Sequence, residues 1–135
     1  MAVSVAALKR VSLFEELDDR DLERLANEFK ERTFPAGASV VSEGASGAAF
    51  FVITDGQATV TVHEKERARL GPGDHFGEIA LLDEGIRSAT VIADTELRCY
   101  GLTPWEFRPF VEGHPQVAWK LLQALARRLR TTQTT

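Results

Sequence analysis

The segment from residue 76 to residue 91 holds the residue types and spacing best suited to chemistry. Gly71, Gly73 and Gly77 crowd before a short helical turn that is predicted over residues 78–82. Glycine permits tight turns and close backbone approach, and the first turn of a helix presents free N–H groups with a partial positive charge. Together these features predict a site for an anion.

Two charged side chains complete this predicted site. Arg87, nine residues after Glu78, offers a planar fork of donors suited to two phosphate oxygens. Ser88, Ala89 and Thr90 can add hydroxyl and backbone donors. A carboxylate beside a phosphate is repelled unless it accepts a hydrogen bond from a neutral donor, which a sugar hydroxyl supplies. One singly charged phosphate and one sugar hydroxyl fit this set, and a plain structural ion pair between Glu78 and Arg87 is the alternative.

These residues resemble, almost position by position, the phosphate-binding cassette of the cyclic nucleotide-binding domain family. The family pattern is F-G-E-[LI]-A-L, a short variable loop, and R-[AST]-A-[TS]-V. The chain carries FGEIAL at residues 76–81 and RSATV at residues 87–91. The likeness covers most of the chain and includes the lead-in LGPGD at residues 70–74.

The resemblance implies a role for each matching residue. Glu78 accepts a hydrogen bond from the ribose 2′-hydroxyl, Arg87 pairs with the cyclic phosphate, and backbone N–H groups near Gly77, Ala80 and Ala89 complete the anion cradle. The last helix is similar to that of catabolite activator protein, which makes two of its residues candidate base contacts. The full set of implied ligand-binding residues is Phe76, Gly77, Glu78, Ile79, Ala80, Arg87, Ser88, Ala89, Thr90, Arg128 and Thr132.

The implied ligand is cAMP or cGMP, with no catalytic residue, metal or further cofactor. In this family a hydroxyl residue directly after the cassette arginine can help to bind guanine, and Ser88 stands there. Members similar to catabolite activator protein also carry serine and prefer cAMP. We therefore expect cAMP in preference to cGMP.

The elements that must position this site follow from composition and periodicity. An acidic helix is predicted over about residues 12–33, with Asp18 as its cap. A glycine-punctuated middle, residues 34–102, shows short apolar runs, and Asp55-Gly56 is a hairpin turn signal. Two helices are predicted over residues 103–131, the first opened by a capping box at Thr103. The apolar runs are residues 39–42, 49–53, 58–63, 68–70, 89–93 and 97–102.

With the resemblance, this order predicts an α+β, mainly β fold in a single domain over residues 1–135. We expect an eight-stranded antiparallel β-roll, similar to a jelly roll, with an N-terminal helix and two C-terminal helices. Ala118, Leu122, Leu125 and Leu129 form an apolar stripe on the last helix, which either packs on its own sheet or forms a homodimer seam. Both tryptophans are expected to pack in the core or on a helix and not to form a stacking platform, and Cys99 is expected to be an inert buried thiol.

Composition excludes several classes of protein. The chain has 135 residues, 44% hydrophobic and 27% charged, as in one soluble globular domain. A net charge of −4 argues against direct nucleic-acid binding through bulk charge. The sequence has no apolar run of the roughly 20 residues that a membrane span needs. The single cysteine cannot form an internal disulfide, so a cytoplasmic location is expected.

The expected function is therefore that of a non-enzymatic sensor domain. It binds a cyclic nucleotide and relays occupancy through its C-terminal helices to an unidentified downstream effector. One alternative is the sensory part of a helix-turn-helix transcription regulator, cut before its output domain. Another is a cupin-type metal enzyme, although His63, His75 and His114 do not form the required His-x-His pair. A degenerate domain that binds only other proteins is the third.

Overall fold

The computed structural model describes residues 3–44, 49–83 and 87–132. Within these residues, eight strands form two four-stranded antiparallel sheets, in the orders β1-β8-β3-β6 and β2-β7-β4-β5. The strands are β1 Lys30–Phe34, β2 Ser39–Val41, β3 Phe50–Asp55, β4 Ala58–Val62, β5 Lys65–Leu70, β6 His75–Phe76, β7 Thr90–Ala93 and β8 Leu97–Leu102. The helices are α1 Val5–Lys9, η1 Ser12–Phe14, α2 Asp19–Ala26, η2 Glu78–Leu81, α3 Pro104–Gly113 and α4 Pro115–Thr132.

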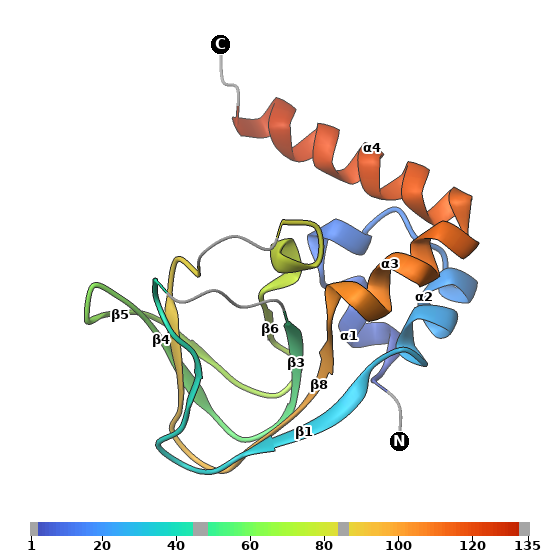
Figure 1. Cartoon of the computed structure of the whole chain (residues 1–135). Coiled ribbons are helices and arrows are strands. Elements are labelled where there is room, and N and C mark those ends of the chain that lie inside the picture. The colour runs from blue at the N-terminus through green and yellow to red at the C-terminus, as the bar shows by residue number, and fades with distance from the viewer. Residues whose placement is uncertain (1–2, 45–48, 84–86, 133–135) are drawn as a thin grey trace.

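This architecture confirms the predicted antiparallel roll flanked by helices. Figure 1 shows α1, α2 and α3 gathered on one side of the roll, with α4 extending past them above the sheets. The short helix η2 lies between this helical group and the strands, at the end of the roll where β3 begins (Figure 1). The cassette segment is thus placed at the junction of the roll with the helices.

Two hydrophobic cores meet at β3, which is buried on both faces. Phe50 and Val52 belong to the core under the helices, where Phe14 lies edge-on to Phe50 at 5.9 Å and 6.2 Å from Phe107. Ile53 belongs to the core inside the roll, together with Ala58, Val91, Ala93 and Leu97. Because β3 contributes to both cores, it fixes the roll against the helical layer.

The predicted N-terminal helix over residues 12–33 is wrong in extent. The helix α2 ends at Ala26, a separate short helix covers Ser12–Phe14, and Lys30–Phe34 forms β1. This strand is at the sheet edge, pairs only with β8, and exposes its first four residues. The sequence of β1 does not alternate between polar and apolar residues, so sequence analysis did not predict this strand.

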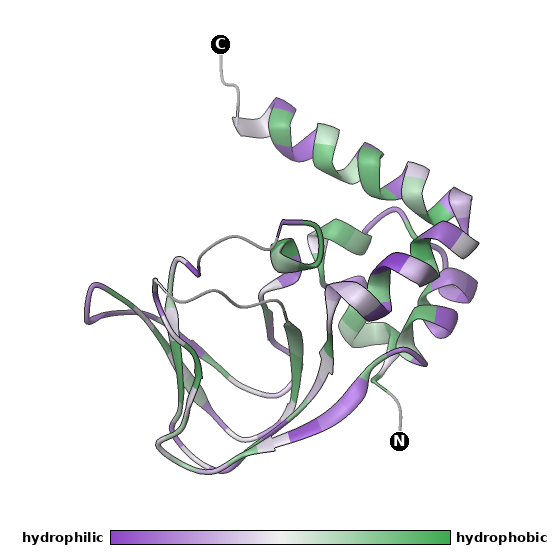
Figure 2. Ribbon diagram, viewed as in Figure 1, coloured by the Kyte–Doolittle hydropathy of each residue, from purple (hydrophilic) through white to green (hydrophobic). Residues whose placement is uncertain are grey.

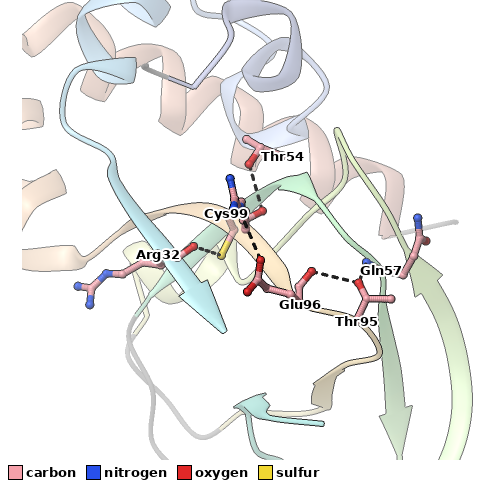
Figure 3. Close-up of polar contacts among 7 residues, drawn as sticks. Arg32, Thr54, Gln57, Thr95, Glu96 and Cys99 are labelled. Carbon is pink, nitrogen blue, oxygen red and sulfur yellow. Dashed lines mark hydrogen bonds and ion pairs between the residues drawn. The ribbon is translucent and has the colours of Figure 1, made fainter. Parts of the chain in front are cut away.

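The predicted hairpin turn at Asp55-Gly56 is also wrong, because β3 and β4 belong to different sheets. Gly56 adopts a φ of +97°, and a Cβ there would lie 2.3 Å from the carbonyl oxygen of Glu96. The Gln57 N–H donates to the Thr95 hydroxyl at 3.1 Å, and that hydroxyl donates to the Glu96 carbonyl at 3.0 Å (Figure 3). The turn therefore joins the two sheets and is held by the β7–β8 turn.

Cys99 lies in β8 and faces the interior. Its Sγ contacts the carbonyl oxygen of Arg32 at 3.7 Å (Figure 3). The residue is buried and forms no disulfide, and burial raises the pKa of its thiol to about 12. The thiol is therefore protonated near neutral pH, as expected for an inert side chain.

The C-terminal helices begin as predicted. The Glu106 carboxylate accepts hydrogen bonds from the Thr103 N–H at 3.1 Å and from the Thr103 hydroxyl at 2.8 Å. The helix α4 buries Val117, Leu121 and Ala124 against the domain. No helix in the described part of the chain has the length and apolarity that a membrane crossing requires.

The predicted apolar stripe of α4 is divided between the two sides of the helix. Leu125 packs against the core under the helices and Ala118 is half-buried, whereas Leu122 and Leu129 are 56% and 59% exposed. Figure 2 shows apolar positions recurring along the whole helix. Trp105 and Trp119 are 68% and 64% exposed, so neither packs in the core, which was one of the two predicted environments. Each occupies an outward position on an amphipathic helix, where spacing alone does not decide burial.

Candidate functional site

The turn before the cassette is clamped by the N-terminal segment. Gly73, at a φ of +89°, donates its N–H to the Ile53 carbonyl at 2.8 Å. The Asp74 carboxylate accepts from the Gly71 N–H at 2.8 Å and pairs with Arg10 at 3.2 Å. Arg10 also donates to the Gly73 carbonyl at 3.0 Å. These contacts set the direction in which the chain enters β6.

Phe76 and Gly77 start the cassette in different ways. The ring of Phe76 packs against that of Phe51 at 5.3 Å, so it anchors the cassette to the roll. Gly77 has a φ of +87°, and a Cβ there would lie 2.6 Å from the Arg87 Nη1 and 2.7 Å from the Ala49 carbonyl oxygen. Only glycine permits this approach of Arg87 to the backbone.

The short helix η2 forms at the predicted place. The Ala80 N–H donates to the Gly77 carbonyl at 3.0 Å, and the Leu82 N–H donates to the Ile79 carbonyl at 3.0 Å. The Ala80 N–H, which the family resemblance assigns to the anion cradle, is therefore engaged within the turn in this structure.

A pocket of about 280 Å³ opens at this turn, close to the lower end of the range for ligand sites. It brings together six of the predicted residues from both blocks of the cassette. Residues 84–86, which fall within the predicted cassette, lie outside the described residues. The pocket is lined by Gly77, Glu78, Ile79, Ala80, Asp83, Arg87 and Ser88.

Arg87 is a half-buried cation whose donors are incompletely used. Its Nη2 donates to the Ala49 carbonyl at 2.6 Å, while its Nε is buried and has no hydrogen-bond partner among the described residues. Among the described residues, no carboxylate lies within 4.0 Å of this guanidinium, and burial lowers the pKa of Arg87. The alternative ion pair with Glu78 is not formed. An anion in the pocket would supply both the missing acceptor and the missing charge.

Glu78 is held by two basic side chains instead. The His75 Nδ1 lies 3.6 Å from one carboxylate oxygen, slightly too far for a hydrogen bond, and the Arg128 Nη2 lies 3.2 Å from the other. The pKa of Glu78 is lowered to about 2, mainly by His75 and to a smaller extent by Arg128. Burial of the carboxylate opposes this shift. Glu78 is therefore an ionised acceptor at neutral pH.

The second block of the cassette is fixed to the turn after β2. The Thr90 hydroxyl accepts from the Glu43 N–H at 2.9 Å, and the Arg87 carbonyl accepts from the Gly44 N–H at 2.9 Å. Thr90 lies in β7, and neither it nor Ala89 lines the pocket. Ser88 does line it and is exposed.

The two predicted base contacts lie beside the pocket and do not line it. Besides Glu78, Arg128 contacts the Ser12 hydroxyl. The Thr132 hydroxyl donates to the Arg128 carbonyl at 2.7 Å, within α4. A hollow of about 410 Å³ lies around these residues, and its lining is Ser12, Glu15, Arg127, Arg128, Thr131 and Thr132.

Sequence reasoning missed three side chains at the site. His75, interpreted as a turn or surface residue, has its Nδ1 buried beside Glu78, and its spacing of three from that residue was the available signal. Asp83 lines the pocket. Ser12 reaches the site only because η1 packs on α4, which the sequence does not reveal.

The described residues include no group of three His, Cys, Asp or Glu side chains placed to hold a metal ion. The pocket lining combines one arginine with the carboxylates of Glu78 and Asp83, and the guanidinium of that arginine is suited to an anionic group.

Comparison with known proteins shows the family to which the chain belongs. The chain matches the Cyclic nucleotide-binding domain family over residues 31–114. A CRP-like cAMP-activated global transcriptional regulator of Mycobacterium tuberculosis is 28% identical over 130 residues, which are 93% of this chain and 58% of that protein. The Cyclic AMP receptor protein of Thermus thermophilus is 33% identical over 128 residues, 91% of this chain and 59% of that protein.

A solved structure agrees closely with the fold. The N-terminal domain of a transcriptional regulator from Streptomyces coelicolor A3(2) superposes with a TM-score of 0.86 at 35% identity, covering 94% of this chain and 92% of that one. The chain spans about three fifths of the length of the curated relatives above. The family match includes both cassette blocks and confirms the resemblance found in the sequence. The chain belongs to the cyclic nucleotide-binding domain family.

Proposed function

We propose that this chain is a non-enzymatic sensor domain that binds cAMP, in preference to cGMP, in the pocket at η2. The observation that carries the proposal is the half-buried guanidinium of Arg87. Within the described part of the chain, the Nε of Arg87 has no hydrogen-bond partner and no carboxylate lies within 4.0 Å of the guanidinium. A buried cation in this state is costly, and a phosphodiester would offset that cost.

The remaining pocket residues fit the other parts of such a ligand. Glu78 is an ionised acceptor for the ribose 2′-hydroxyl, and Ser88 lies at the pocket wall beside Arg87. The names of the relatives from Mycobacterium tuberculosis and Thermus thermophilus both refer to cAMP. These names support the choice of adenine over guanine.

Occupancy would be relayed to α4 through Arg128. This residue holds the Glu78 carboxylate at 3.2 Å without a ligand, and the ribose hydroxyl competes for the same carboxylate. Binding would therefore free Arg128 to approach the base, together with Thr132, and shift the position of α4. The sensory part of a helix-turn-helix regulator is the second candidate, because the relative from Mycobacterium tuberculosis is named a transcriptional regulator.

The outer face of α4 supports a homodimer as part of the relay. Leu122 and Leu129 are more than half exposed and lie seven residues apart, as in a coiled-coil seam. We propose that an unidentified effector receives the signal and that this chain does not itself bind nucleic acid. A cytoplasmic location fits the single reduced cysteine.

A thermal melt with cAMP, cGMP and 5′-AMP tests this proposal. A ligand at a hundred times its dissociation constant stabilises the fold by about 2.7 kcal/mol. We expect a clear rise in Tm with cAMP, a smaller one with cGMP at equal concentration, and none with 5′-AMP. An unchanged Tm with both cyclic nucleotides would refute the proposal and favour a degenerate domain used only for protein contacts.

A further inference from the structure

His75 occupies an unusual position for an imidazole. It lies in β6, and its ring is edge-on to Phe50 at 5.9 Å. The side chain is 23% exposed, and its Nδ1 is buried with no hydrogen-bond partner in the residues that the structure describes. The nearest acceptor is the Glu78 carboxylate, whose Oε2 lies 3.6 Å away. Buried polar atoms in folded proteins are nearly always hydrogen-bonded. A small movement of either side chain, or a proton added to the imidazole, would therefore change the interaction between the His75 Nδ1 and the Glu78 carboxylate.

The groups around His75 come from several elements. Glu78 on η2 lies directly opposite, and Arg128 on α4 holds the far oxygen of that carboxylate at 3.2 Å. The neighbouring strand β3 contributes the apolar residues Phe50 and Val52, the latter paired with His75 in register. The adjacent Asp74 carboxylate is engaged by Arg10 and by a backbone N–H.

We propose that His75 is a positioning residue for Glu78 and that cyclic nucleotide binding is coupled to proton uptake by its imidazole. Ligand affinity then rises as the pH falls from 8 to 6. This inference rests on the proposed function, because it assumes that an anionic ligand enters the pocket beside Glu78.

Two changes that accompany ligand binding determine whether His75 takes up or releases a proton. The ligand brings a negative phosphodiester into the pocket that Glu78 and Arg87 line, and it competes with Arg128 for the carboxylate. Both the added negative charge and the withdrawn positive charge favour the imidazolium form. A state that binds more protons is favoured at lower pH, and the coupling is reciprocal.

Glu78 and the arginines keep their charges over the pH range of the proposal. The pKa of Glu78 is lowered to about 2, so its carboxylate stays ionised between pH 6 and pH 8, and arginine stays protonated there. The pocket lining also includes the Asp83 carboxylate. Histidine is the type of side chain whose charge ordinarily changes in the physiological pH range, and His75 is the histidine that lies beside Glu78.

Isothermal titration calorimetry with cAMP at pH 6.0, 7.0 and 8.0 tests the inference. Repeating each titration in two buffers of different ionisation enthalpy measures the protons taken up. We expect net proton uptake near pH 7 and about threefold to tenfold tighter binding at pH 6.0 than at pH 8.0, since one coupled proton changes affinity by at most tenfold per pH unit.

Matched variants assign the effect to His75. His75→Phe keeps an aromatic ring against Phe50 and His75→Gln keeps a neutral donor, and both should bind cAMP with pH-independent affinity. His63→Gln is the control, because His63 is 83% exposed and pairs with Glu43 outside the pocket. This control should keep the full pH dependence. If His75→Phe does not fold, as judged by circular dichroism, His75→Gln gives the same comparison.

The outcomes separate this inference from the proposed function. Binding of cAMP with flat affinity across this pH range, or a pH dependence that survives in the His75 variants, overturns the role of His75 and leaves the sensor function intact. Failure of the wild-type protein to bind cAMP or cGMP at any pH overturns both.

Discussion

The two ends of β3 handle their polar groups in opposite ways. After β3, the Gly56 turn is closed by a chain of bonds through Gln57 and Thr95 (Figure 3). Before β3, the Ala49 carbonyl receives Arg87, and the two buried side-chain atoms without a partner among the described residues lie there, the Arg87 Nε and the His75 Nδ1. Folded proteins pair nearly all buried polar groups, so this difference distinguishes the scaffold end from the end at which we propose that a ligand binds.

Removing one arginine from each end gives the largest expected contrast. Arg87→Ala should weaken cAMP binding at least about thirtyfold, since removing one partner of a buried charged pair costs about 2–5 kcal/mol. Arg98→Ala, at the far end of the roll, removes an exposed guanidinium 3.6 Å from Glu96 and should leave affinity unchanged. Calorimetric titration measures both. Equal affinity of Arg87→Ala and the wild type would contradict the assignment of the phosphate site.

Replacing one glycine by alanine at each end of β3 distinguishes an effect on stability from an effect on cAMP affinity. Both positions are left-handed, which costs an alanine about 1–2 kcal/mol before any clash. Gly56→Ala also meets the Glu96 carbonyl at 2.3 Å, whereas Gly77→Ala meets the Arg87 Nη1 at 2.6 Å. We expect both variants to unfold at lower urea concentration, and only Gly77→Ala to lose cAMP affinity as well.

Comparison of the two variants requires conditions in which each remains folded. Affinity is therefore measured at low temperature, after circular dichroism has shown native secondary structure. Unimpaired binding by folded Gly77→Ala would mean that the close approach of Arg87 to the backbone is unnecessary.

The smallest expected effect concerns the scaffold end alone. Thr95→Ala removes the acceptor of the Gln57 N–H and the donor to the Glu96 carbonyl. Because these bonds are exposed, the free energy of unfolding should fall by about 1 kcal/mol or less, with cAMP affinity unchanged. Thr95→Ser keeps the hydroxyl and serves as the control in the same urea titration. A loss of affinity in Thr95→Ala would show that the two ends are coupled.

Sequence patterns predicted the strands whose side chains alternate or form apolar runs. The run at residues 58–63 corresponds to β4, and that at residues 97–102 to β8. The strand β1, with the sequence KERTF, was missed because it lies at the sheet edge and exposes its first four side chains. The two-residue strand β6 is too short for any period to be read.

The cassette residues were predictable by type, but their partners were not. Gly77, Glu78 and Arg87 follow from the motif and meet in one pocket. The partner of Arg87 is a backbone carbonyl 38 residues away, and the hydrogen-bond donor to Glu78, the second partner besides His75, is a side chain 50 residues away. Such pairings depend on how β3 and α4 pack against the cassette, which neither propensity nor spacing encodes.

Two arginine side chains connect the N-terminal segment of the chain to the cassette. Arg10 holds Asp74 on one side, and Arg128 contacts both Ser12 and Glu78 on the other. Arg10, Ser12 and Arg128 all fall outside residues 31–114, the span that matches the family. A protein trimmed to that span would keep both blocks of the cassette motif but would lose the contacts that Arg10 and Arg128 make on either side of it. We therefore expect that the smallest domain with an intact site is larger than the region by which the family is recognised.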